Sequence, residues 1–280
     1  MISHHNLLEE LNVIVRHQSS ADDLAAALQH AIWRNSMAGE GIDIHHIKPH
    51  ARTIPWSGMD SKIRYENYLA DPTHRQLLAQ YGWIDTPIKY HINSWGFRSE
   101  REYDNVAEPC IVALGCSFTY GTGLHAVDTW PHVLASMLGV GVVNLGMAGH
   151  GLDLNSLWLR LKGDGIANPI GVCVVEPPAG RISWMKHIGD TVLGHTLKEV
   201  SDRIPDILAD LLLNSTMHYY KNYLLINEWA NNRNIPLLWS NTRLYTEPGV
   251  NVSSARDLGH WGVEWHRVKA EEFYNHLKNT

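Results

Sequence analysis

Long apolar runs are absent from this chain of 280 residues, and so is an excess of positive charge. A membrane-spanning helix needs about 20 consecutive apolar residues, and no run of even about 18 occurs. The formal net charge is −6, whereas a nucleic-acid-binding surface requires clustered Lys and Arg side chains. We therefore expect neither a membrane nor a nucleic acid as a partner.

Cysteine is also scarce, with Cys110, Cys116 and Cys173 as the whole set. All three lie in apolar, strand-like surroundings, and their odd number favours buried thiols over a disulfide framework. The first residues, MISHHNLLEELNVIVRHQ, lack the order of basic and then apolar residues that marks a secretory signal. We expect a protein that is cytoplasmic as synthesised.

The 18 histidines do not form a recognisable metal motif. The adjacent pairs His4–His5 and His45–His46 cannot both face one metal ion from a helix, and no Cys or carboxylate accompanies them at ligand spacing. The run 121–126 matches a G-x-G-x-x-A dinucleotide string, but it begins six residues beyond the preceding strand. We expect no metal ion and no cofactor.

The apolar content of 44% and charged content of 19% are typical of a globular protein with a substantial core. From Cys110 onward, short apolar runs alternate with helical stretches, which favours an α/β fold with a parallel sheet covered by helices on both faces. Strands are expected at 110–114, 141–145, 170–175 and 235–239, and helices near 129–138, 152–162, 202–213, 215–233 and 262–278.

The first part of the chain differs in pattern. Helices are expected at 5–17 and 21–36, followed by an irregular stretch at 37–87 in which the sequence indicates no element. We interpret residues 1–87 as an N-terminal extension, helical and then irregular, and residues 88–280 as the α/β domain.

Functional residues in a parallel sheet gather where the strands end. The first expected strand ends in LGCSFTYGTG, in which glycines on both sides of Ser117 allow a sharp turn that presents the hydroxyl group. Backbone N–H groups beyond Ser117 could then face an oxyanion. The alternative is a tight strand–helix loop with an incidental serine. The second expected strand is followed by LGMAGHG, where Gly149 is either a second N–H donor or a plain turn glycine.

Asp257 and His260 stand three residues apart, just before the last expected helix. A carboxylate at this spacing can accept the Nδ1–H of the ring, which leaves Nε2 free to act as a base toward a serine hydroxyl. The pattern favours a catalytic pair; the alternative is a structural histidine near the start of a helix.

The runs GCSFTYGTG, VVNLGMAGHG and DLGH resemble, in this order, the first block, the second block and the terminal Asp-x-x-His block of SGNH (GDSL-like) hydrolases. The runs NSWGFR at 93–98 and DTWP at 128–131 resemble the segments that flank the first block. The resemblance covers roughly 88–160 and 236–278 and implies a flavodoxin-like three-layer sandwich. It assigns Ser117 as nucleophile and first oxyanion donor, Gly149 as second donor, His260 as general base and Asp257 as its orienting carboxylate.

Two positions depart from the family pattern. Cys116 replaces the usual Asp of the first block, and we expect its thiol to point into the core. The Asn of the third block, the usual third oxyanion donor, is missing, because the chain reads VEPPAGR at 175–181. Removing one such donor typically lowers turnover about 10²–10³-fold. Arg181 is the candidate replacement; the alternative is an exposed Arg after a Pro-Pro turn.

Two hypotheses follow. In the first, the chain is a serine-dependent ester hydrolase that acts on a small acyl ester, such as an acetylated carbohydrate, through an acyl-enzyme. Transfer of the acyl group to another alcohol is the same chemistry with a different acceptor. In the second, the chain is a weak or inactive SGNH-fold binding or structural component, phage-associated or part of a virion, in which residues 1–87 assemble a homo-oligomer or particle.

Overall fold

The computed structural model describes residues 51–103, 107–177, 184–188, 191–195, 208–242 and 252–278. The expected helices at 5–17 and 21–36, and the candidate residue Arg181, lie outside these ranges.

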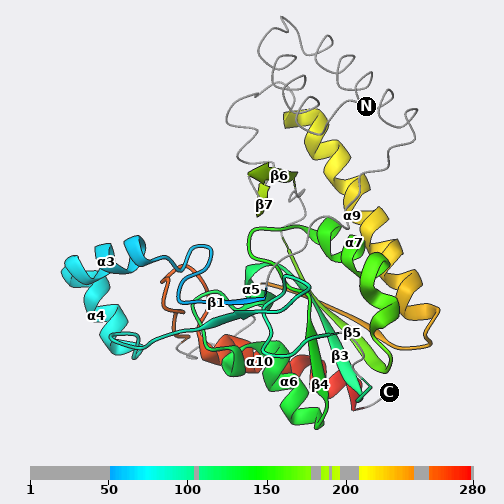
Figure 1. Cartoon of the computed structure of the whole chain (residues 1–280), viewed down its shortest axis with the longest axis horizontal. Helices are drawn as coiled ribbons and strands as arrows, with labels where there is room; N and C mark the ends of the chain where they lie inside the picture. Colours follow the sequence, from blue (N-terminus) through cyan, green and yellow to red (C-terminus); the bar gives the residue numbers. More distant parts are fainter. Residues whose placement is uncertain are drawn as a thin grey trace, which may run out of the picture.

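A four-stranded parallel sheet forms the centre of the fold (Figure 1). Its strands are β3 (Cys110–Gly115), β4 (Gly141–Asn144), β5 (Pro169–Glu176) and β8 (Leu237–Asn241). They lie in the order β4-β3-β5-β8, and every neighbouring pair is parallel. Counted along the chain, this order is 2-1-3-4, which is that of a flavodoxin-like doubly wound sheet and confirms the predicted fold class. The strand order reverses between β3 and β5, so the crevice beyond the carboxyl ends of these two strands is where such sheets bind ligands.

Alternate residues of the central strands face two different layers of helices. Val112 and Leu114 of β3 pack in one buried cluster with residues of α7 (Leu152–Lys162) and α9 (Leu208–Asn231). Ile111 and Ala113 pack in a second cluster with residues of α6 (Trp130–Leu138) and α10 (Val263–Leu277). Because successive side chains of a strand point to opposite faces, the near-continuous apolar run of β3 is buried on both sides.

Among the helices expected after Cys110, those at the start of α9 differ from the observed ones. The sequence predicted separate helices at 202–213 and 215–233, whereas α9 runs without a break through Asn214 and Ser215. These two residues are weak helix formers, but a break usually requires Gly or Pro, and neither occurs there. Residues 202–207 lie outside the described part. The remaining short elements of the α/β part are α5 (Ser117–Tyr120), η2 (Ala126–Asp128), η3 (Gly163–Gly165) and the antiparallel hairpin of β6 (Trp184–Ile188) and β7 (Thr191–His195).

The stretch that the sequence left without elements contains two helices and a strand in its described part, from residue 51 onward. These are β1 (Arg52–Ile54), α3 (Lys62–Ala70) and α4 (Pro72–Gln80), and β1 pairs antiparallel with β2 (Tyr90–Ile92). The helices α3 and α4 extend to one side of the sheet (Figure 1). They bury little, since Leu78 is the one buried residue in the pair. Among the described helices, none combines the length and apolar character that crossing a bilayer demands.

Candidate active site

The structure brings Ser117, His260 and Asp257 into one hydrogen-bonded line. The Oγ atom of Ser117 lies 2.7 Å from Nε2 of His260, and Nδ1 of His260 lies 2.6 Å from Oδ2 of Asp257. All three residues are less than 9% exposed. A carboxylate can only accept, so Nδ1 carries the proton that it donates to Asp257, and Nε2 is left to accept the hydroxyl proton of Ser117.

A tight turn between β8 and α10 holds this pair in place. The other carboxylate oxygen, Oδ1 of Asp257, accepts the backbone N–H of Gly259 (3.2 Å) and of His260 (3.1 Å). Between the acid and the histidine, Leu258 has a φ of 49°. Such a left-handed backbone typically costs a residue other than glycine about 1–3 kcal/mol and is concentrated at functional sites. The turn therefore orders both members of the pair through the backbone as well as the side chains.

The serine lies directly beyond the end of β3, as the first residue of α5. Gly115 makes the sharp exit possible, because a methyl group there would lie 2.2 Å from Oγ1 of Thr119 and 2.5 Å from the carbonyl oxygen of Val175. Cys116 is fully buried, with its Sγ 3.9 Å from Oγ of Ser117. Among the described residues, none accepts the backbone N–H of Ser117.

Asn144 connects the two loops that follow β3 and β4. Its Nδ2 donates to the carbonyl oxygen of Thr119 in α5 (2.9 Å), and its Oδ1 accepts the N–H of Gly146 (2.9 Å). Farther along the second loop, Gly149 has a φ of 82° and lies in the turn that the N–H of His150 closes onto Met147. The described part contains no acceptor for the N–H of Gly149 either. Two backbone donors are thus available beyond the ends of neighbouring strands.

The segment that resembles the family's flanking run supports the loop after α5. Arg98 is 2% exposed, and its guanidinium donates to the carbonyl oxygens of Tyr120, Gly121 and Leu124. The glycines of that loop pack closely against neighbouring segments. A methyl group on Gly123, whose φ is 77°, would lie 3.0 Å from the backbone nitrogen of Arg256. The triad turn thus rests directly on the loop that follows the nucleophile.

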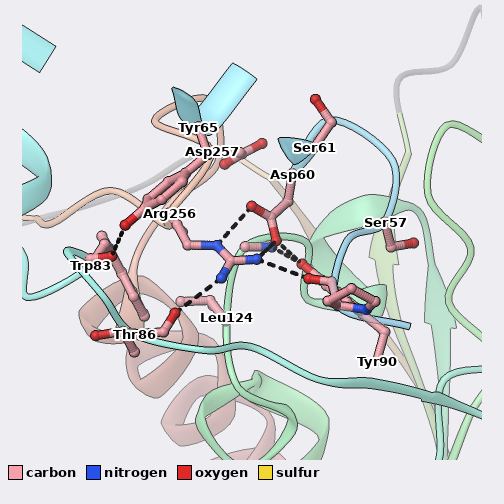
Figure 2. A network of polar contacts seen from close by, with 12 residues as sticks. Ser57, Asp60, Ser61, Tyr65, Trp83, Thr86, Tyr90, Leu124, Arg256 and Asp257 are labelled. Atoms are coloured by element: carbon pink, nitrogen blue, oxygen red, sulfur yellow. Dashed lines mark hydrogen bonds and ion pairs between the residues drawn. The ribbon is translucent and has the colours of Figure 1, made fainter. Parts of the chain in front are cut away.

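Sequence reasoning missed a buried ion pair next to the triad. Arg256 immediately precedes Asp257, and Figure 2 shows its guanidinium directed at the carboxylate of Asp60. Nε of Arg256 donates to Oδ1 of Asp60 (2.9 Å) and Nη2 donates to Oδ2 (2.6 Å), with the two side chains only 3% and 1% exposed. Tyr90 donates its hydroxyl proton to Oδ2 of Asp60 (2.5 Å) and accepts the N–H of Gly123. Burial and the nearby carboxylate raise the pKa of Tyr90, so it stays a neutral donor.

Other contacts tie the same N-terminal segment to the triad turn. The hydroxyl of Tyr68 donates to the carbonyl oxygen of Asp257 (3.2 Å), and Nε1 of Trp83 donates to that of Ser254 (2.8 Å). The ring of Trp56 lies 4.1 Å below the guanidinium carbon of Arg256. No local sequence signal could have found these contacts, because each joins residues far apart in the chain.

The expected third oxyanion donor, Arg181, lies outside the described residues. His266 is 1% exposed, and its Nδ1 accepts the N–H of Trp130 at the start of α6. In the described ranges, no group of three or more His, Cys, Asp or Glu side chains is placed to hold a metal ion.

No protein-family model and no curated protein matches the sequence. Solved structures to which the chain is similar include a protein assigned to the G-D-S-L family of lipolytic proteins from Desulfitobacterium hafniense DCB-2, at 18% identity and a TM-score of 0.32, over 59% of this chain and 98% of that one. Others are a carbohydrate esterase family 2 enzyme with a carbohydrate-binding domain from Corynascus thermopiles (Myceliophthora fergusii), at 13% identity and a TM-score of 0.33, and an acetyl xylan esterase from Butyrivibrio proteoclasticus, at 14% and 0.34. Each of these two matches covers 61% of this chain and less than two thirds of the other, 66% and 64%.

Proposed function

We propose that this protein is a serine-dependent ester hydrolase in which Ser117 is the nucleophile. The observation that carries the proposal is the line from Ser117 Oγ through His260 to Asp257, with both contacts at hydrogen-bond distance. An ordinary serine in a strand–helix loop has no reason to be aligned with a histidine that a buried carboxylate orients. This arrangement lets the ring take the hydroxyl proton as the oxygen attacks.

In acylation, Oγ of Ser117 attacks the carbonyl carbon of the ester while its proton passes to Nε2 of His260. The imidazolium that forms is stabilised by Asp257, and the tetrahedral oxyanion is held by the N–H groups of Ser117 and Gly149. When the intermediate collapses, the bond to the alcohol oxygen breaks, and His260 returns the proton to that oxygen. The products of this half-reaction are a free alcohol and an acyl-enzyme at Ser117.

In deacylation, water takes the place of the alcohol. His260 removes a proton from the water, whose oxygen attacks the acyl carbon, and Ser117 recovers its proton as the acid leaves. An alcohol in place of water would give acyl transfer by the same steps. The substrate class that follows from the block resemblance is a small acyl ester, with an acetylated carbohydrate as the first to test.

The test is the steady-state hydrolysis of p-nitrophenyl acetate by the wild type, Ser117→Ala and Asp257→Asn. We expect Ser117→Ala to fall to background, and Asp257→Asn to lose about 10⁴-fold in kcat, because the amide cannot select the required tautomer. Release of acetate from acetylated xylan would identify the carbohydrate class. A folded wild type that cleaves none of these esters would favour the second hypothesis, a binding or structural component with residues 1–87 as its assembly arm.

A further inference from the structure

A short loop of the N-terminal segment, residues 57–59, lies close to each of the three segments that carry the candidate catalytic groups. Oγ of Ser57 lies 2.7 Å from the hydroxyl of Tyr120, the last residue of α5. A methyl group on Gly58 would lie 3.5 Å from Cβ of Ala148, which precedes Gly149. The 57–59 loop therefore lies across the ends of the loops that follow β3 and β4.

The third contact is with the triad turn. Cε of Met59 would lie 3.3 Å from a methyl group built on Gly259, the residue before His260. Met59 is nevertheless 48% exposed. An apolar side chain that lies close to the residue before the proposed catalytic histidine and remains open to solvent can contact a molecule bound in the site.

The buried Asp60–Arg256 ion pair fixes the position of the 57–59 loop. Asp60 follows Met59 directly and is held by two hydrogen bonds from Arg256, whose own neighbour is Asp257 (Figure 2). Arg256 also donates to the carbonyl oxygen of Pro55, just before the loop (3.2 Å). One buried guanidinium thus holds both ends of the 57–59 loop and the start of the triad turn.

We propose that the 57–59 loop is a wall of the substrate site and that the side chain of Met59 contacts the alcohol portion of the ester. This inference rests on the proposed function. In that reaction His260 returns its proton to the alcohol oxygen, so the departing alcohol must lie beside Nε2 of His260. The carbonyl oxygen of the ester faces the oxyanion donors, and the acyl chain occupies a separate position on the reacting carbon. Met59, beside the residue that precedes His260, is on the alcohol side and selects alcohols that present an apolar face.

The experiment separates the two halves of the ester. In a first series the acyl group is always acetyl and the alcohol varies from methanol to phenol, p-nitrophenol and 4-methylumbelliferone. In a second series the alcohol is always p-nitrophenol and the acyl group is acetyl, propionyl or butyryl. Values of kcat/KM are measured for the wild type, for Met59→Ala and for Met217→Ala, a matched control because Met217 on α9 is 72% exposed and outside the site.

We expect Met59→Ala to lower kcat/KM for 4-methylumbelliferyl acetate about tenfold, the usual effect of losing an apolar contact in a binding site, and to leave methyl acetate nearly unchanged. The factor should be the same for all three acyl groups, and Met217→Ala should behave as the wild type throughout. An active enzyme in which Met59→Ala changes nothing, lowers every ester equally or alters acyl-chain preference would overturn this inference alone. An inactive wild type would overturn the proposed function and, with it, the inference.

Discussion

Asp60 and Arg256, 196 positions apart in the chain, form a bidentate ion pair that is almost fully buried. Arg256 directly precedes Asp257 in the sequence. The pair joins the segment that precedes the sheet to the turn that carries the proposed acid and base. Two charges removed from water are tolerated here because every one of the oxygens and nitrogens involved has a partner within the network. The N-terminal segment from residue 51 onward is therefore structurally part of the candidate site.

The first prediction concerns the stability that depends on this pair. Asp60→Asn leaves the guanidinium of Arg256 buried without a counter-charge, and breaking a buried pair in this way typically costs about 3–5 kcal/mol. The free energy of unfolding in urea measures the loss. Glu66→Gln is the control, since it removes the exposed Lys62–Glu66 pair on α3 and should cost less than about 0.5 kcal/mol. Equal losses in the two variants would contradict the structural importance of the Asp60–Arg256 pair.

The second prediction concerns the contact between the nucleophile loop and the triad turn. Gly123→Ala should lower both stability and kcat, because the new methyl group would press on Ala255 and on the backbone of Arg256 and displace the turn that holds His260. Gly82→Ala is the matched control. Its φ of 75° carries the same backbone strain, but nothing lies within 4 Å of the added methyl group. We expect Gly82→Ala to cost about 1–2 kcal/mol in stability and nothing in kcat; a matching loss of kcat there would contradict the steric explanation.

The sequence predicted the sheet and the helices after Cys110 closely, because buried parallel strands are apolar on both faces and leave an unmistakable pattern. It also singled out Ser117, Asp257 and His260, since all three follow strands or precede a helix in compact local motifs. It failed for α3 and α4, whose few buried side chains give no helical periodicity. Their caps were the available signal: Ser61 accepts the N–H of Arg64, and Asp71, followed by Pro72, accepts that of His74.

The supporting network could not be predicted in the same way. The partners Asp60 and Arg256 come from segments with no shared motif, and an ion pair leaves no trace in the periodicity of either. Asn144 is similar, since its role appears only when the loops after β3 and β4 are placed side by side. These contacts depend on the tertiary fold, whereas the triad residues lie in local motifs.

A third prediction follows from His266, which is buried beneath the start of α6. Burial, with His260 and Arg98 nearby, lowers its pKa to about 3, from an ordinary value near 6.5. Below pH 6.5 the unfolded chain takes up this proton while the folded protein does not, so stability should fall by up to about 1.4 kcal/mol per pH unit between pH 6.5 and pH 3. His132, with a pKa lowered to about 4, acts in the same direction. Urea unfolding across this range measures the slope.

In that experiment His266→Asn should reduce the slope of the unfolding free energy against pH by up to about 1.4 kcal/mol per pH unit, which corresponds to one proton. The amide oxygen of Asn can still accept the N–H of Trp130, but the amide does not titrate. An unchanged slope would mean that His266 does not bind its proton differently in the folded and unfolded states.

A fourth prediction concerns the third oxyanion donor. A guanidinium is a stronger donor to an oxyanion than a neutral amide, provided that it is held in place. If Arg181 replaces the missing Asn, Arg181→Ala should lower kcat about 10²-fold and leave KM unchanged, which marks a group that acts in the transition state. Wild-type kinetics in Arg181→Ala would leave the oxyanion with the N–H groups of Ser117 and Gly149, and a slow enzyme would then be expected.

The most direct test of Ser117 as nucleophile is covalent labelling with a fluorophosphonate, followed by intact mass and peptide mapping. The neighbouring thiol of Cys116, 3.9 Å from the hydroxyl, is the competing nucleophile. We predict one adduct on Ser117 in the wild type, the same adduct in Cys116→Ala and none in Ser117→Ala. Labelling that persists in Ser117→Ala and disappears in Cys116→Ala would contradict the assignment of the serine.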